Sequence, residues 1–137
     1  MIRSALLNFA PSMPIYFITA TNTLGCSLLL PSDSDLRPVL NSSDGSGVGG
    51  LAGTPLHPPA LENVRALRSM CDGDGVLTAI QIIGVGGVSD AVGFRRMKAV
   101  GASAVEIGTA LGRRCVKVFE EISNGGLRGW RQDGCRP

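Results

Sequence analysis

Short apolar runs alternate along this chain with longer stretches whose apolar residues recur every three or four positions. Three of the short runs, residues 15–20, 79–85 and 103–107, are rich in apolar and β-branched residues and predict β-strands. A strand that is apolar throughout is covered on both faces, which is typical of parallel sheets. We therefore expect the three strands to be parallel.

The longer stretches predict three helices. The first begins at about Pro58, because proline is tolerated in the first turn of a helix, and it ends at the sequence CDGDG. The second covers residues 90–100, with Ser89 as its N-cap and Gly101 just beyond its end. The third covers residues 109–122, where apolar residues again follow a helical period.

The remaining segments predict connections. Residues 27–30 and 37–40 are two short apolar runs that we expect to pair as a small hairpin. Residues 41–54 are rich in glycine and serine and predict a loop. His57 stands among prolines and is interpreted as a loop residue. The tail from Asn124 shows no periodicity and predicts irregular structure.

This alternation of strands and helices indicates the α/β class, either as a doubly wound sheet or as a (β/α) barrel. A closed barrel takes eight strands, so three strands would make less than half of one. The 137 residues allow one domain at most, or a part of a larger one.

Composition excludes several classes of function. A formal net charge of +2 and an aromatic content of 4% give no basic patch or stacking platform for nucleic acid. No apolar run approaches the roughly 18 residues that span a membrane, and Pro11 and Pro14 interrupt the apolar N-terminal segment, against a signal peptide. Four cysteines without CxxC spacing and a single histidine argue against a zinc site. Unpaired thiols suit a reducing compartment.

Two glycine loops follow neighbouring predicted strands, GVGG at residues 84–87 and IGTALG at residues 107–112. A dinucleotide fingerprint would need a third glycine where this chain has Ser89. Because parallel strands end at one edge of a sheet, backbone N–H groups of both loops could instead face a single phosphate, beside the helix that Thr109 begins. The alternative is that these are ordinary turn and packing glycines.

Together with TNTLG and GVGGLAGTPLHPPALENVRAL, these glycine motifs make the chain similar to the C-terminal part of dihydroorotate dehydrogenase. The ending IGTAL resembles the cytosolic class 1 form. The resemblance covers residues 15–123, whereas residues 1–14 and the tail 124–137 do not look like the family. It implies a partial (β/α)8 TIM barrel, about strands 6–8, that binds FMN and oxidises dihydroorotate to orotate in pyrimidine biosynthesis.

The resemblance also implies residue roles. Asn22 and Thr23 match the pair that contacts the pyrimidine, although Asn22 alone could equally be a turn residue. The positions that match the FMN-contacting set are Thr21, Gly50, Gly86, Gly87, Gly108 and Thr109, the last four around the phosphate. No catalytic residue is assigned, because the family's proton-abstracting Cys or Ser and its flavin-contacting lysine belong to the first half of the barrel.

Three functions stay open at this point. The first is a cytoplasmic FMN-dependent dihydroorotate dehydrogenase, which would pass a hydride from the substrate C6 to the flavin N5. The second is another FMN barrel that acts on pyrimidines, similar to dihydropyrimidine dehydrogenase. The third is a non-catalytic half-barrel that binds flavin or phosphate. An open segment of barrel would pair with another copy or with the missing half. The electron acceptor, whether fumarate, NAD or quinone, is left open.

Overall fold

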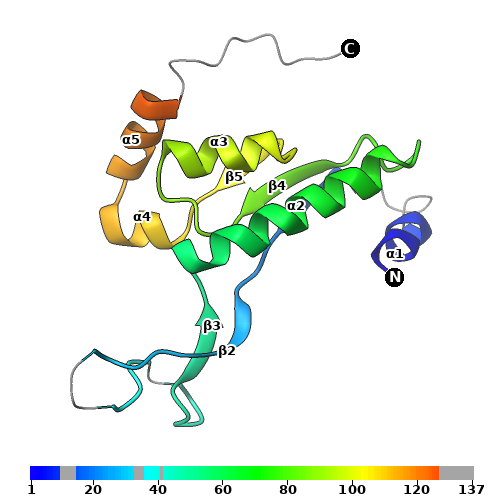
Figure 1. The fold of residues 1–137 in the computed structure, drawn as a ribbon. Coiled ribbons are helices and arrows are strands. Elements are labelled where there is room, and N and C mark those ends of the chain that lie inside the picture. The colour runs from blue at the N-terminus through cyan, green and yellow to red at the C-terminus, as the bar shows by residue number, and fades with distance from the viewer. Residues whose placement is uncertain (10–14, 33–35, 41, 127–137) are drawn as a thin grey trace.

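The computed structural model describes residues 1–9, 15–32, 36–40 and 42–126. A three-stranded parallel sheet is its centre, with strand order β1-β4-β5. The strands are β1 (Phe17–Ala20), β4 (Gln81–Val85) and β5 (Ala104–Glu106), which confirms the three predicted parallel strands. The helices α2 (His57–Asp72) and α3 (Ala91–Ala99) cover one face of this sheet (Figure 1).

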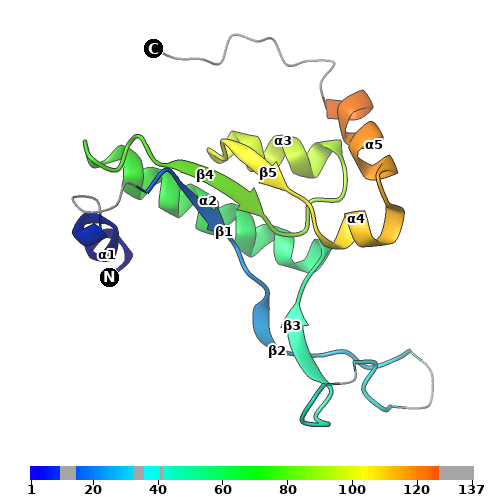
Figure 2. The same cartoon turned by 180° about the vertical axis from the view of Figure 1, so that it is seen from behind.

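Among the described residues, no helix covers the face of the sheet that is turned away from α2 and α3 (Figure 2). Alternation along each strand sends every second side chain to the helical face. Ile82 is fully buried there, whereas Phe17 is 58% exposed on the opposite face. The mixed α/β architecture was therefore predicted correctly, and in the described part of the chain the sheet is covered on one side only.

A short 3₁₀ turn, η1 (Thr54–Leu56), directly precedes α2. Pro58 and Pro59 lie in the first turn of α2, where their missing N–H groups cost no helical hydrogen bond. Its inner face carries Ala60, Val64 and Cys71, all fully buried. Removing a side chain such as that of Val64 from water stabilises the fold by roughly 2 kcal/mol. Burial also raises the pKa of the Cys71 thiol, so this cysteine acts as a core residue.

The start of α3 differs from the prediction by one residue. Asp90, and not Ser89, is the N-cap, and its carboxylate accepts a 2.7 Å hydrogen bond from the N–H of Gly93. A carboxylate at that position also interacts favourably with the positive end of the helix dipole. Gly101 follows the helix at φ 105°, as expected for a residue beyond a helix end.

The predicted third helix is two helices, α4 (Thr109–Arg114) and α5 (Lys117–Gly126), and the single-helix prediction is wrong. The break lies at Cys115, whose φ is 52°. Apolar periodicity continues across the break because Val118 and Ile122 of α5 join the same core, so the pattern alone did not reveal it. α5 continues through Gly126, into the segment that was expected to be irregular.

The prediction for the segment between β1 and α2 was also wrong. β2 (Leu24–Leu28) pairs antiparallel with β3 (Val48–Leu51), inside the segment expected to be a loop. The two runs predicted to pair share one backbone hydrogen bond, from Val39 to Leu29. A glycine-rich segment has low strand propensity, but Gly50 lets β3 approach its partner closely.

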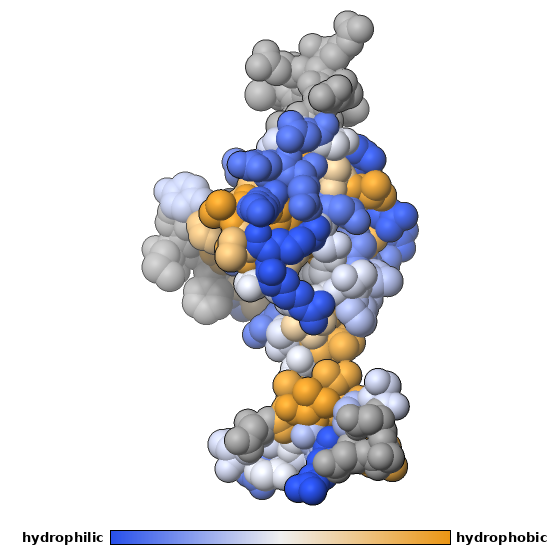
Figure 3. Space-filling model, turned by 90° about the vertical axis from the view of Figure 1, so that its left-hand side faces the viewer, coloured by the Kyte–Doolittle hydropathy of each residue, from blue (hydrophilic) through white to orange (hydrophobic). Residues whose placement is uncertain are grey.

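The β2–β3 arm projects from the edge where the parallel strands end (Figure 1). Hydrophobic residues gather on its surface, which Figure 3 shows below the main body. The exposed large apolar residues of the described part of this region are Leu24, Leu28, Leu29, Leu30, Leu36, Val39, Leu40 and Val48. An apolar surface of this kind usually contacts other protein atoms.

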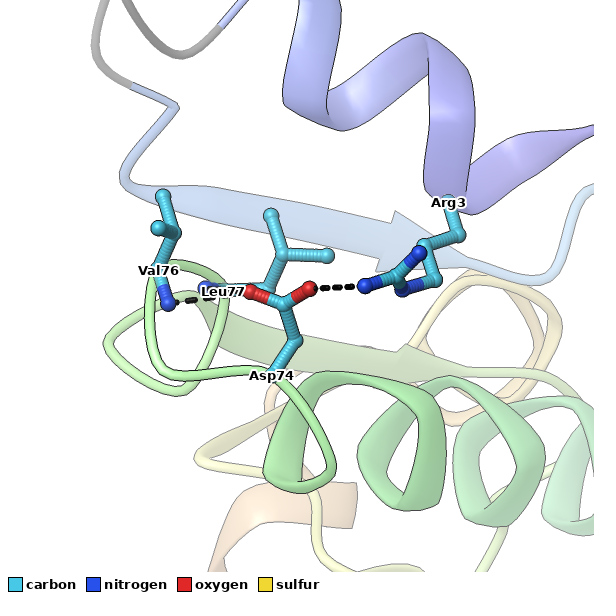
Figure 4. A network of polar contacts seen from close by, with 4 residues as sticks. All are labelled: Arg3, Asp74, Val76 and Leu77. Atoms are coloured by element: carbon cyan, nitrogen blue, oxygen red, sulfur yellow. Dashed lines mark hydrogen bonds and ion pairs between the residues drawn. The ribbon is translucent and has the colours of Figure 1, made fainter.

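A helix that was not predicted, α1 (Ile2–Phe9), packs at the opposite end of the sheet, where Leu6 and Leu7 contact the small core around Leu77. The carboxylate of Asp74 ties this helix to the turn after α2 (Figure 4), because it pairs with Arg3 at 2.5 Å and accepts the N–H of Val76 at 3.0 Å. The Val76 hydrogen bond and the Arg3 charge hold the pKa of Asp74 below its ordinary value.

Candidate functional site

A cleft of about 1270 Å³ lies where the three parallel strands end. The segments that follow β1, β4 and β5 line it, together with the arm and the start of α2. In open α/β sheets, ligands usually bind in the crevice outside the carboxyl ends of the strands. All eight residues to which the sequence assigned binding roles line this cleft: Thr21, Asn22, Thr23, Gly50, Gly86, Gly87, Gly108 and Thr109.

Gly86 and Gly87 form a tight connection between β4 and α3. Both have positive φ angles, 139° and 65°, which side chains rarely adopt. A Cβ atom on Gly86 would lie 2.4 Å from the Cβ of Ala60, and one on Gly87 would lie 2.6 Å from the carbonyl oxygen of Gly53. Packing against the start of α2 therefore requires glycine at both positions, independently of any ligand.

His57 is helical and buried, so its interpretation as a loop residue is wrong. It is the first residue of α2 and is 7% exposed. Its Nδ1 lies 2.9 Å from the carbonyl oxygen of Gly86. The flanking prolines, which suggested a loop, belong to the first turn of the helix, and the contact with Gly86 joins segments 29 residues apart that no local pattern could connect.

Gly87 and Gly108 both line the cleft, and they differ in what surrounds them. In the described part of the chain, no residue accepts the N–H of Gly87. Gly108 has an ordinary φ of −106°, and a Cβ atom there would meet nothing within 4 Å. Neither backbone conformation nor packing against described residues explains glycine at 108, and the space beside it at the cleft is open. Thr109, the next residue in the chain, adds a hydroxyl group to the lining of the cleft.

Thr21 is held by two hydrogen bonds. Its N–H donates to the carbonyl oxygen of Val85 at 2.8 Å, which extends the β1–β4 pairing by one residue. Its hydroxyl oxygen accepts from the amide of Asn63 on α2 at 2.7 Å. The N–H of Thr21 is consequently not available to a ligand, and Asn63 is a positioning residue that the sequence analysis missed.

Asn22 and Thr23 follow Thr21 directly in the chain. The side-chain oxygen of Asn22 accepts the N–H of Thr23 at 2.8 Å, a local bond of the kind expected of a turn residue. The amide nitrogen of Asn22 has no hydrogen-bond partner among the described residues, so it can donate to a ligand. On the facing strand, a Cβ on Gly50 would lie 2.4 Å from the Thr23 hydroxyl oxygen, which shows how closely β3 approaches this pair.

Two arginines that the sequence analysis did not single out line the same cleft. Arg114 pairs with Glu121 at 2.6 Å and donates a very short hydrogen bond to the carbonyl oxygen of Ser89. Arg113 contacts no charged group in the described part of the chain, and it lies one helical turn after Thr109, on the same side of α4. This i, i+4 spacing after the IGTALG loop was the sequence signal that could have identified it.

The donor set fits a monoanionic or dianionic phosphate next to a larger neutral group. Around the cleft it offers unbonded backbone N–H groups, among them that of Gly87, together with the Thr109 hydroxyl, the Arg113 guanidinium, the Asn22 amide nitrogen and apolar surface from the arm. Across the residues that the structure describes, no group of three His, Cys, Asp or Glu could hold a metal ion. None of the described helices is long and apolar enough to cross a membrane.

Comparison with known proteins identifies the family to which the chain belongs. A family model described as dihydroorotate dehydrogenase matches residues 5–127. The catalytic subunit of dihydroorotate dehydrogenase B (NAD⁺) from Pyrococcus horikoshii is 40% identical over 101 residues, which are 72% of this chain and 29% of that protein. Dihydroorotate dehydrogenase A (fumarate) from Lactococcus lactis subsp. cremoris is 31% identical over 130 residues, 90% of this chain and 38% of the relative.

Solved structures show the same likeness. The ligand-free DHODH of Eimeria tenella superimposes with a TM-score of 0.62 and 25% identity, over 90% of this chain and 30% of that one. Its complex with ferulenol gives a TM-score of 0.61 at 24% identity. The chain thus spans about a third of the length of the relatives it matches.

Proposed function

Because the chain belongs to the dihydroorotate dehydrogenase family, we propose that it forms the FMN-binding part of an enzyme that oxidises dihydroorotate to orotate in pyrimidine biosynthesis. The observation that carries this proposal is the convergence of all eight candidate residues on one cleft at the carboxyl edge of the sheet. Bound FMN would supply the hydride acceptor, and the residues of this chain would bind and orient it.

Each group of residues has a separate task in this proposal. The N–H of Gly87 and the hydroxyl of Thr109, near Gly86 and Gly108, would hold the phosphate of FMN, and Arg113 would balance its charge. Thr21 and Gly50, which line the same cleft, would hold the flavin. The free amide nitrogen of Asn22 and the hydroxyl of Thr23 bind the pyrimidine.

We further propose that residues 15–123 correspond to about strands 6–8 of a (β/α)8 barrel. β1 and β5 are the outer strands of the parallel sheet, and the face opposite α2 and α3 is uncovered in the described chain. The remaining strands of a barrel would pair with those edges and cover that face. They could come from a second polypeptide or from another part of a longer protein, in the cytoplasm.

A second candidate is a module that binds flavin without oxidising substrate. It is favoured because none of the eight candidate residues in the cleft is assigned as a general base. General acid–base catalysis needs a base within hydrogen-bond reach of the substrate proton, and we assign no such base in this chain.

Flavin absorbance separates these candidates. The purified chain is titrated with FMN, and dihydroorotate is then added without oxygen. FMN binding followed by bleaching of the flavin with dihydroorotate supports the oxidation reaction. Bleaching by a dihydropyrimidine that lacks the carboxylate of dihydroorotate supports an enzyme similar to dihydropyrimidine dehydrogenase instead. Binding without bleaching supports the non-catalytic module. A folded chain that does not bind FMN contradicts the site.

Gly108→Asp tests where the phosphate lies. The new side chain enters open space, so the fold should persist while a carboxylate faces the phosphate and weakens FMN binding by at least tenfold. Gly112→Asp is the matched control, because Gly112 also has open space around its Cβ position but does not line the cleft. Equal FMN affinities for the two variants, measured by fluorescence quenching, would refute the placement. Gly86 and Gly87 are less suitable, since any side chain there disturbs packing.

A further inference from the structure

His57 makes a single side-chain hydrogen bond in the described structure, and that bond is to the glycine loop. Its Nδ1 lies 2.9 Å from the carbonyl oxygen of Gly86. A carbonyl oxygen can only accept, so Nδ1 carries the hydrogen and donates it. Nε2 is buried and has no hydrogen-bond partner in the described part of the chain. The position of the imidazole is therefore set by packing and by the Gly86 carbonyl.

This hydrogen bond determines the direction of the next N–H group. The Gly86–Gly87 peptide is trans, so its carbonyl oxygen and its N–H point in opposite directions. Because the carbonyl oxygen points to His57, the N–H of Gly87 points away from the first turn of α2. No described residue accepts that N–H, and both glycines line the cleft.

Two consecutive glycines leave this peptide free to turn over, because neither residue has a side chain to restrict φ and ψ. A turned peptide would present the carbonyl oxygen of Gly86 where the N–H of Gly87 now lies. An anion there would then meet a partial negative charge in place of a donor. The His57 hydrogen bond favours one of these two arrangements, the one that suits an anion.

We propose that His57 is a positioning residue, which keeps the N–H of Gly87 turned towards the cleft and so gives the cleft its preference for a phosphorylated flavin over an unphosphorylated one. This inference rests on the proposed function, in which the anion is the phosphate of FMN. It assigns to the only histidine of the chain a role that depends on the location of a single ring hydrogen.

The ring hydrogen is observable directly. Since the chain has one histidine, a long-range ¹H–¹⁵N spectrum of the imidazole contains a single, unambiguous set of signals. At a pH at which imidazole is neutral, we expect the hydrogen on Nδ1. A hydrogen on Nε2, or averaging between the two nitrogens, would overturn the inference without reference to flavin.

A pair of conservative variants tests the consequence. In His57→Asn the amide nitrogen can take the place of Nδ1, whereas in His57→Gln the longer side chain places its amide nitrogen near Nε2. We expect His57→Asn to keep the wild-type ratio of FMN to riboflavin affinity. His57→Gln should lower that ratio about tenfold, the usual effect of losing one hydrogen bond, with riboflavin affinity unchanged.

The outcomes distinguish this inference from the proposed function. If wild-type chain binds FMN more tightly than riboflavin and His57→Gln leaves that ratio intact, the positioning role is wrong and the proposed function stands. If both flavins weaken equally in both variants, His57 serves packing alone. If the folded wild-type chain binds neither flavin, the proposed function itself fails. Circular dichroism of each variant verifies folding, and the ring-hydrogen spectrum decides the case if His57→Gln does not fold.

Discussion

At the scale of single residues, backbone conformation explains several identities better than side-chain chemistry does. Gly86 and Gly87 have positive φ angles and no room for a Cβ, so the fold itself requires glycine there. Cys115 shows the opposite case, a residue with a side chain at φ 52° and ψ −153°, in a region that is almost restricted to glycine. The break between α4 and α5 therefore stores strain in this chain.

Replacing Cys115 tests that strain. Cys115→Gly should stabilise the chain by about 1 kcal/mol, because relief of roughly 1–3 kcal/mol of strain exceeds the roughly 0.5–1 kcal/mol that glycine costs through its freedom in the unfolded state. The midpoint of urea unfolding measures the change. Cys115→Ala removes the thiol but keeps the strain and should change little. A Gly variant no more stable than the Ala variant would show that this conformation carries no strain.

At the scale of elements, the arm shows how tertiary contacts create a strand from an unfavourable sequence. β3 contains Gly49 and Gly50, and glycine has low strand propensity. It still pairs with β2, because the absence of a side chain at Gly50 leaves room for the side chain of Thr23. An isolated two-stranded ribbon is marginally stable in water. Small changes in packing should consequently affect the arm before they affect the core.

Gly50→Ala tests this dependence. The added Cβ would lie 2.4 Å from the Thr23 hydroxyl oxygen, so β3 must move away and the amide hydrogens of β2 should exchange several-fold faster. Hydrogen exchange followed by mass spectrometry measures the effect, and the thermal midpoint of the core should hardly change. Gly25→Ala, in the same ribbon but with open space around its Cβ position, should exchange like wild type. Equal acceleration in both variants would contradict the role of Gly50.

At the scale of the whole molecule, the sheet is open on one face and at both outer strands in the described chain. Phe17 is 58% exposed on that face, and the arm adds further apolar surface. Exposed strand edges and apolar patches favour association with another chain. This arrangement is what a partial barrel predicts.

Without the rest of a barrel, the chain should therefore associate with itself in a concentration-dependent way. Phe17→Ser should weaken that association about tenfold or more, since it removes an aromatic side chain from the surface to be buried. Val76→Ser is the control, because Val76 is similarly exposed, at 62%, but lies in the turn after α2. Sedimentation velocity measures both. A wild-type chain that stays monomeric at high concentration would contradict the expectation.

The extent to which the sequence predicted this molecule follows from how local each feature is. The three parallel strands and the helices α2 and α3 were predicted because a buried strand and an amphipathic helix have periods visible within about ten residues. The gathering of all eight candidate residues in one cleft was also foreseeable, since parallel strands end at one edge. The pairing of β2 with β3 and the helix α1 were not, because each depends on contacts with segments far along the chain. The break at Cys115 was not foreseeable either, because the apolar period continues across it.

By itself, then, the sequence determined the α/β class, the order of the main elements and the family, through hydrophobic periodicity and short motifs. Only the tertiary structure decided which partner β2 has, that His57 is a buried helical residue, and that Gly86 and Gly87 are needed for packing while Gly108 has open space beside it. The physical reason is the same in each case. Propensity and periodicity are local properties, whereas steric exclusion and the hydrogen bond from His57 to Gly86 arise between atoms that folding alone brings together.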